Sequence, residues 1–256
     1  MALRTVSATR YVTPLREGGS LPAIVEADDD GMYVLKFRGA GQGAKALVAE
    51  LVAGELARAA GLAVPEIVLI ELDAELARAE PDAEIQELIK ASVGLNIALD
   101  YLPGSVTYDP VADRVDPGLA SRIVWFDAFV ANIDRSPRNT NMLLWHRKLW
   151  LIDHGAALYV HHATDDFAAR SRDAFAQVKD HVLLAQANEV ESADAELAAR
   201  LTPAVLREVL ALVPDAWLPG DAAARRAAYT SYLAARVEAP RPFIEEILRA
   251  RRALHL

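Results

Sequence analysis

The sequence predicts an α+β protein with a bilobal arrangement: a small β-rich N-terminal lobe and a larger helical C-terminal lobe. Short β-branched runs gather in the first hundred residues, and helical periodicity dominates from about residue 119. A Pro-Gly pair at 103–104 separates the two patterns. We therefore place the lobes at residues 1–103 and 104–256, with a hinge over residues 100–104.

The elements predicted for the N-terminal lobe are separated by clear turn and stop signals. Strands over residues 21–27 and 31–39 flank an acidic turn that Gly31 closes, which is typical of a hairpin. Residues 44–61 carry apolar side chains at helical spacing and end at Gly61. The remaining elements are a strand over 64–73, a helix over 82–92 and an extended segment over 94–104.

The C-terminal lobe is predicted to begin with a helix over residues 119–132. Two short apolar strands, over 141–145 and 148–153, follow it and are joined by a His-Arg turn, so we expect a hairpin. From residue 173 onward we expect mainly helices. Their predicted breaks are at Pro203, Pro214, Pro219 and residues 240–242.

Composition excludes several classes of protein. The 256 residues are 53% hydrophobic and carry a net charge of −9, the wrong sign for a non-specific nucleic-acid binder. The absence of cysteine excludes disulfides, thiolate metal sites and a cysteine nucleophile. The first residues lack the apolar core of a signal peptide, and no apolar run reaches the roughly 18 residues of a membrane span. We expect a cytoplasmic protein without a membrane span or a direct nucleic-acid partner.

Lys36 is unusual because it lies inside an apolar strand. Burying an unpaired ammonium group is costly, so the side chain needs an anionic partner. Glu50, on the following helix, is one candidate, and nucleotide phosphates are another. The alternation of a strand also allows Lys36 to face the solvent, and the sequence leaves this alternative open.

Asp134 and Asn139 are separated by the spacing D-x-x-x-x-N. Protein kinases use this spacing in a loop whose Asp receives the proton of the substrate hydroxyl and whose Asn binds magnesium. A plain turn around residues 136–137 also explains the pattern. Asn141 competes with Asn139 as a metal ligand, and spacing alone favours Asn139.

Asp153 ends the second strand of the predicted hairpin and precedes His154-Gly155. A carboxylate at a strand end suits a hard cation such as Mg²⁺, although it also suits a simple strand-end cap. Lys36, Asp134, Asn139 and Asp153 together supply the parts that phosphoryl transfer needs: a cation for phosphates, oxygens for magnesium and a carboxylate for the attacking hydroxyl.

Two glycine-rich segments are candidates for covering phosphates. Gly18, Gly19 and Ser20 precede the first predicted strand, where missing side chains let backbone amides approach an anion. Residues 38–45 match the P-loop pattern poorly, and we interpret them as a connector. The adjacent histidines 161 and 162 are interpreted as surface residues rather than a zinc pair.

The order of these parts resembles the HipA-like kinases, a bacterial branch of the protein-kinase-like superfamily that also includes phosphatidylinositol 4-kinase-like proteins. The segments that carry the resemblance are "YVLKF", "LVAELVAGELARAAGLAVPE", "DYLPG", "FVANIDRSPRNTNMLLW" and "LWLIDHGAAL". The chain has "NIDR" and "IDHG" where eukaryotic protein kinases have H-R-D and D-F-G. These replacements fit the HipA-like branch better.

The resemblance implies a bilobal kinase fold with ATP and Mg²⁺ as cofactors. It implies that Lys36 contacts the ATP phosphates, supported by Glu50, and that Asp134 is the catalytic base. It implies that Asn139 and Asp153 hold magnesium. An adenine-binding strand is implied at Leu99, Asp100, Tyr101 and Leu102, through backbone groups.

We therefore expect an ATP- and magnesium-dependent phosphotransferase that acts on a protein serine or threonine, or on a small hydroxyl compound. The main alternative is a catalytically inactive nucleotide-binding module that acts in signalling. A third interpretation, an acidic helical interaction protein, would leave Lys36, Asp134, Asn139 and Asp153 scattered.

Overall fold

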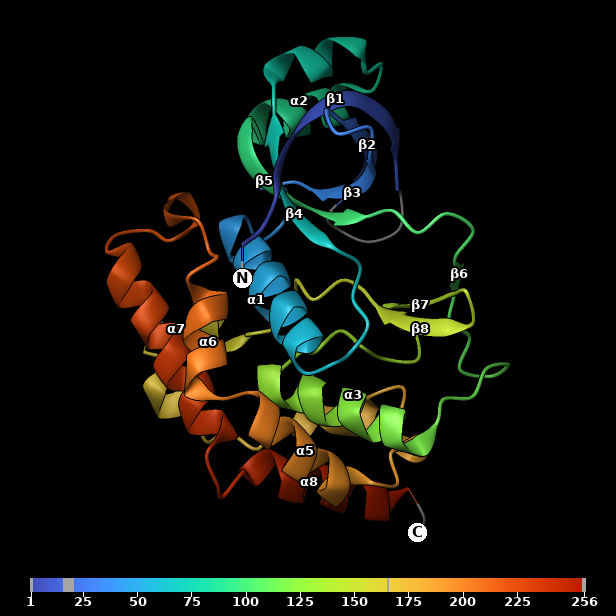
Figure 1. Cartoon of the computed structure of the whole chain (residues 1–256), viewed down its shortest axis with the longest axis vertical. Helices are drawn as coiled ribbons and strands as arrows, with labels where there is room; N and C mark the ends of the chain where they lie inside the picture. Colours follow the sequence, from blue (N-terminus) through green and yellow to red (C-terminus); the bar gives the residue numbers. More distant parts are fainter. Residues whose placement is uncertain (1, 16–20, 165, 255–256) are drawn as a thin grey trace.

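A computed structural model of the chain describes residues 2–15, 21–164 and 166–254, without the side chains of Ala79 and Ala168. Its N-terminal strands close into a barrel in the order β1-β2-β3-β5-β4 (Figure 1). Strands β1 and β4 pair in parallel, and the other pairs are antiparallel. The strands are β1 (Thr5–Pro14), β2 (Ala23–Ala27), β3 (Met32–Lys36), β4 (Ile67–Leu72) and β5 (Gly94–Asp100).

The alternation of strand β3 decides where Lys36 points. Tyr33 and Leu35 are buried and belong to the core of the barrel, together with side chains of β2, β4 and β5. Because successive side chains of a strand point to opposite faces, Val34 and Lys36 lie on the other face. That face carries the ion pairs described below.

Three helical segments flank the barrel, and they pack against different cores. The short helix η1 (Ala74–Ala79) and helix α2 (Ala83–Ala91) add apolar side chains to the barrel core. Helix α1 (Ala44–Ala59) instead joins the core of the C-terminal helices, and every residue from Leu47 to Ala57 is buried. Gly54 permits its close approach to β4, since a Cβ there would lie 2.5 Å from Cδ1 of Ile67.

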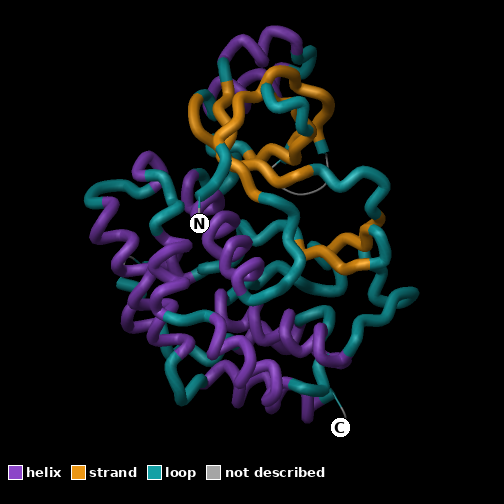
Figure 2. Tube along the Cα trace, in the orientation of Figure 1, coloured by secondary structure: helices purple, strands orange, loops and turns teal. Residues whose placement is uncertain are grey.

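The C-terminal part is helical apart from a small antiparallel sheet (Figure 2). The sheet has the order β6-β7-β8. Its strands are β6 (Val106–Thr107), β7 (Met142–Trp145) and β8 (Lys148–Leu151). The helices are α3 (Pro117–Val130), α4 (Val160–Ala163), α5 (Val190–Arg200), α6 (Pro203–Leu210), α7 (Ala222–Val237) and α8 (Pro242–Ala253).

Helix α3 shows how local sequence fixes an element next to the site. The side chain of Asp116 accepts a hydrogen bond from the backbone amide of Leu119, and Pro117 occupies the first turn. The helix ends at Ala131, whose left-handed backbone (φ 52°) turns the chain into the 131–141 loop. Ten of the eleven residues from 120 to 130, all except Arg122, are buried and anchor this loop to the core.

The α+β fold with a β-rich N-terminal part and a helical C-terminal part agrees with the sequence prediction. Two local predictions were incomplete. Strand β1 was not predicted as a separate element, and residues 173–189 form short 3₁₀ turns instead of helices. Those turns are η3 (Ala176–Asp180) and η4 (Leu184–Gln186). Two further 3₁₀ helices, η2 (Ala168–Arg170) and η5 (Asp215–Trp217), lie outside this segment. Over the described ranges, no helix is both long and apolar enough to cross a membrane.

Candidate active site

Lys36 lies between two carboxylates. Its Nζ is 2.6 Å from Oε2 of Glu50 on α1 and 2.5 Å from Oδ1 of Asp153, which follows β8. The Lys36 side chain is only 12% exposed, so the solvent-facing alternative is wrong. One ammonium group therefore joins the barrel, helix α1 and the segment after β8.

Burial and charge act in opposite directions on this cluster. Burial by itself would lower the pKa of Lys36, but the carboxylates of Glu50 and Asp153 outweigh it and raise that pKa. Burial would likewise raise the pKa of Glu50, and the nearby Lys36 ammonium, with a smaller effect of His154, holds it well below its ordinary value. Both members of the buried pair are charged at neutral pH.

Asp134 lies on the 131–141 loop, between α3 and β7. Its backbone amide donates to Oδ1 of Asn132, at 3.2 Å. Its Oδ2 accepts a hydrogen bond of 2.9 Å from Nδ2 of Asn139. A tight turn over residues 136–139, closed by two backbone hydrogen bonds between Ser136 and Asn139, makes that contact possible. The turn and the close approach of the two side chains are therefore both present.

Asn141 differs from Asn139 in its surroundings. Asn139 is exposed, whereas Asn141 is 9% exposed and adopts a left-handed backbone, with φ 48°. The Nδ2 of Asn141 donates to the backbone carbonyl of Asp134 at 2.6 Å. Its own carbonyl accepts from the amide of Ile152, the residue before Asp153. The β7–β8 hairpin thus brings Asn141 and Asp153 to the same end of the sheet.

The backbone at Asp153 is also left-handed, with φ 55°. Such a conformation is uncommon for residues other than glycine, although Asp and Asn tolerate it best. It turns the chain sharply after β8, so that the carboxylate reaches Lys36. The Asp153 side chain is 41% exposed, which leaves oxygen available for a ligand.

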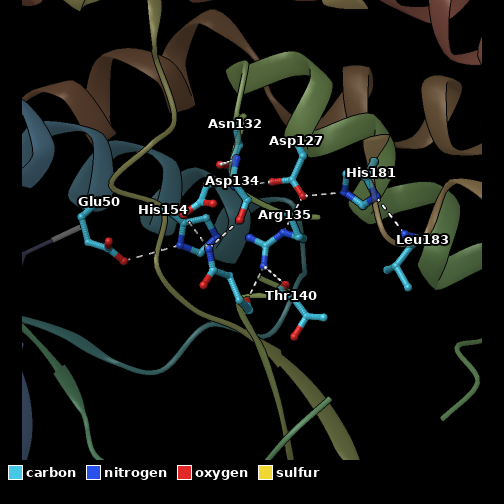
Figure 3. Close-up of polar contacts among 10 residues, drawn as sticks. Glu50, Asp127, Asn132, Asp134, Arg135, Thr140, His154, His181 and Leu183 are labelled. Carbon is cyan, nitrogen blue, oxygen red and sulfur yellow. Dashed lines mark hydrogen bonds and ion pairs between the residues drawn. The ribbon is translucent and has the colours of Figure 1, made fainter. Parts of the chain in front are cut away.

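A buried clamp around Asp127 supports the 131–141 loop (Figure 3). Oδ2 of Asp127 accepts from Nε of Arg135 at 2.6 Å and contacts Nε2 of His181 at 2.9 Å. Oδ1 accepts from Nδ2 of Asn132 at 3.0 Å. Burial alone would raise the pKa of Asp127, but the Arg135 guanidinium and the hydrogen bond from His181 lower it well below its ordinary range.

One signal of this clamp is present in the sequence, although Asp127 was not among the predicted site residues. Asp127 lies within the apolar run "RIVWFDAFV", just as Lys36 lies within an apolar strand, and a charge in such a run needs a buried partner. His181 is 54 residues away in the sequence, and no local pattern links the two.

The segment proposed for adenine runs out of β5. Leu99 and Leu102 are buried, whereas Asp100 is exposed and Tyr101 is half-buried. The amide of Asp100 donates to the carbonyl of Glu66, and that of Tyr101 donates to Met32. Within the described ranges, the amide of Leu102 has no protein acceptor.

The two glycine-rich segments and the histidine pair were also interpreted from the sequence. Gly18, Gly19 and Ser20 lie outside the described residues. Residues 38–43 connect β3 to α1 through turns, and Gly41 and Gly43 have positive φ. The surface interpretation of the histidine pair was wrong for His161, which is fully buried and contacts the hydroxyl of Tyr229 through Nδ1, at 2.9 Å.

The sequence model of the HipA-like kinases matches residues 9–238, which is most of the chain. The chain belongs to the HipA-like kinase family. The resemblance read from the sequence is therefore confirmed. Among curated proteins, a sequence search found no match.

The fold of this HipA-like kinase is similar to that of solved kinases. The crystal structure of the Helicobacter pylori proinflammatory kinase CtkA matches with a TM-score of 0.55 and 12% identity, over 98% of this chain and 99% of that one. The Golgi casein kinase with Mn/ADP bound matches with a TM-score of 0.52 and 13% identity, over 98% of this chain and 74% of that one. At such identities the likeness establishes the kinase fold, as predicted.

Proposed function

We propose that this HipA-like kinase is an ATP- and Mg²⁺-dependent phosphotransferase that transfers the γ-phosphate to a hydroxyl group of a protein serine or threonine, or of a small molecule. The observation that supports it most directly is the position of Lys36, whose ammonium is shared by the buried Glu50 and the half-exposed Asp153. A lysine held in this way presents a fixed positive charge for nucleotide phosphates.

In this proposal Lys36 contacts phosphate oxygens and Glu50 holds it in place. Glu50 is fully buried, and its strong contact with Lys36 keeps the ammonium from swinging out to the solvent. Because a phosphoryl group carries spread negative charge, a positioned cation stabilises the transfer more than a mobile one.

The donor set beside Lys36 fits a hard divalent cation. Asp153 supplies a carboxylate and Asn141 an amide oxygen, both oxygen ligands of the kind that Mg²⁺ prefers. Because Nδ2 of Asn141 is bound to the carbonyl of Asp134, its Oδ1 points away from that carbonyl. We propose Asp153 and Asn141 as metal ligands and retain Asn139, which spacing favoured, as the competing candidate. The bound cation would neutralise charge on the nucleotide phosphates.

Asp134 is proposed to accept the proton of the acceptor hydroxyl. Asn139 occupies Oδ2 of Asp134, and among the described residues no donor contacts Oδ1. A carboxylate with one oxygen fixed and the other available can orient a hydroxyl and take its proton. The Asp127 clamp would keep the loop in the required geometry, since Arg135 and Asn132 flank Asp134 in the sequence.

The nucleotide base is proposed to lie against residues 99–102. The amide of Leu102, which has no acceptor among the described residues, can donate to a ring nitrogen, and the buried side chains of Leu99 and Leu102 offer apolar surroundings. The Golgi casein kinase, whose fold is similar, was solved with Mn and ADP bound, which supports a nucleotide and a divalent metal in this chain.

The proposal is tested by melting the protein with ATP plus Mg²⁺ and with ATP alone, and then by measuring ATP turnover. We expect the melting temperature to rise most with both ligands, and Asp153→Asn to abolish that metal-dependent part. Lys36→Met, which keeps the apolar stem, should lose turnover by at least about a hundredfold while retaining most nucleotide binding. A shift without turnover would instead identify an inactive nucleotide-binding module, and no shift would overturn the proposal.

A further inference from the structure

His154, next to Asp153, is a buried polar residue that the proposed reaction does not use. Its side chain has no exposed surface. Both ring nitrogens are buried, and neither has a hydrogen-bond partner among the described residues. A buried imidazole that leaves both nitrogens unpaired is costly, so its position needs an explanation.

Glu50 has a buried acceptor atom that lacks a hydrogen-bond donor. Its Oε2 accepts from Lys36, but Oε1 is buried and has no hydrogen-bond donor within the described ranges. Nδ1 of His154 lies 3.6 Å from this oxygen. This distance is about 0.7 Å longer than a usual N–H···O hydrogen bond. Figure 3 shows the His154 ring beside Glu50, on the side that faces the 131–141 loop.

We propose that His154 is a positioning residue: its Nδ1–H donates to Oε1 of Glu50, and the pair of contacts at the two carboxylate oxygens fixes Glu50 against Lys36. Since a neutral imidazole carries one N–H, the carboxylate oxygen selects the tautomer with the proton on Nδ1. A ring rotation that brings Nδ1 about 0.7 Å closer to Oε1 would form this hydrogen bond. Only the expected effect on kcat rests on the proposed function; the contact between His154 and Glu50 does not.

The surrounding backbone supports a fixed position for His154. The segment 153–155 lies directly against helix α1, since a Cβ built at Gly155 would be 3.7 Å from both the carbonyl of Ala46 and Oε2 of Glu50. The carbonyl of His154 accepts a hydrogen bond from the amide of Ala157, which closes a turn. His154 is therefore held beside the helix that carries Glu50, and cannot turn away without disturbing Asp153.

The test compares variants that keep or remove the donor. His154→Asn retains an N–H near the position of Nδ1, His154→Gln moves it toward the position of Nε2, and His154→Phe fills the volume without a donor. We expect kcat to fall at least about tenfold in the Phe and Gln variants and to stay within about threefold in the Asn variant, with KM for ATP changed less than kcat. His146→Asn, at an exposed turn, is the matched control and should match the wild type.

A double-mutant cycle with Glu50→Gln separates positioning from general damage. If His154 acts through Glu50, adding His154→Phe to Glu50→Gln costs little further activity. Equal activity of the Asn, Gln and Phe variants, or additive losses in the cycle, would overturn the inference. Should the Phe variant not fold, the ranking of Asn above Gln decides the same question.

The same double-mutant cycle is also measured by urea unfolding, which does not depend on catalytic activity. Non-additive shifts of the unfolding midpoint show that His154 and Glu50 interact, and additive shifts overturn the inference. If the wild type shows no phosphotransfer but the unfolding shifts are non-additive, the proposed function fails while the contact stands. The two failures are therefore distinguishable.

Discussion

The guanidinium of Arg135 and the carboxylate of Asp127 form an ion pair in which both side chains are entirely buried, with Nε of Arg135 2.6 Å from Oδ2 of Asp127. Arg135 also donates to the backbone carbonyl of Asn141. One side chain thus joins helix α3 to the far end of the 131–141 loop. Asp134 lies inside this closed arrangement, so the stability of the loop depends on the pair.

Asp127→Ala should destabilise the protein by about 3–5 kcal/mol, because removing one partner of a buried pair leaves an uncompensated charge. Urea unfolding monitored by circular dichroism measures this. The matched control is Glu75→Ala, which removes the exposed pair with Arg78 and should change the free energy of unfolding by no more than about 0.5 kcal/mol. Similar losses in both variants would contradict the importance of the buried clamp.

A second prediction concerns the pH dependence of stability. Burial, followed by the charges of His162 and Lys45, lowers the pKa of His161 from 6.5 to about 3. The unfolded chain therefore binds one more proton at His161 than the folded chain does between about pH 6.5 and pH 3. Stability falls as the pH drops through this window, by at most about 1.4 kcal/mol per pH unit, and is unaffected above it.

His161→Asn should reduce the slope of the unfolding free energy against pH between pH 6 and pH 5. The expected reduction corresponds to about one bound proton, or about 1.4 kcal/mol per pH unit. Urea unfolding at several pH values gives the slope for both proteins. Asp127 and Glu50, whose pKa values are lowered, contribute only at more acidic pH, so they do not mask the difference. Equal slopes would show that His161 is not held in its neutral form.

The sequence was most informative where a charged residue interrupts an apolar run. Lys36 required a buried partner, and Glu50 is that partner in the structure. The hairpin that carries Asp153 followed from two short apolar strands and a turn. The roles of Lys36, Asp134, Asn139 and Asp153 in the reaction stay predictions.

Other features depend on contacts between distant segments, which a single sequence does not reveal. Strand β1 has mostly exposed or half-buried residues, so no apolar alternation identifies it, and its pairing with β2 and β4 creates it. The burial of His161 depends on Tyr229, 68 residues later. The choice between Asn139 and Asn141 depends on the end of the β7–β8 hairpin, which spacing from Asp134 does not describe.

A third prediction separates these two asparagines. Asn141→Asp should strengthen Mg²⁺ binding in the presence of ADP by at least about threefold, because added ligand charge raises the affinity for a hard cation. Asn139→Asp is the matched control: it makes the same amide-to-carboxylate change at the other asparagine that is hydrogen-bonded to Asp134, and it should leave the affinity unchanged. Titration calorimetry with Mg²⁺ measures both. The opposite ranking would assign the ligand to Asn139.

The last prediction concerns Asp134, for which a structural and a catalytic role make opposite demands. As a turn residue, Asp134 contributes its backbone and one side-chain oxygen, and Asn would serve equally well. As the catalytic base it must accept a proton, which an amide cannot do. General-base contributions are typically about 10²–10⁴-fold in rate, or roughly 3–5 kcal/mol in activation free energy at about 1.36 kcal/mol per decade.

Asp134→Asn should therefore lose at least about a hundredfold in single-turnover phosphotransfer, or in slow ATP hydrolysis while the acceptor is unidentified. It should bind ATP and Mg²⁺ nearly as well as the wild type, since the proposed ligands are Asp153 and Asn141. Its melting temperature should stay within a few degrees, because the contacts of the loop with Asp127 do not involve the Asp134 carboxylate. A variant with wild-type turnover would reduce Asp134 to a turn residue, whereas loss of turnover at unchanged binding and melting is the result that only a proton-accepting carboxylate explains.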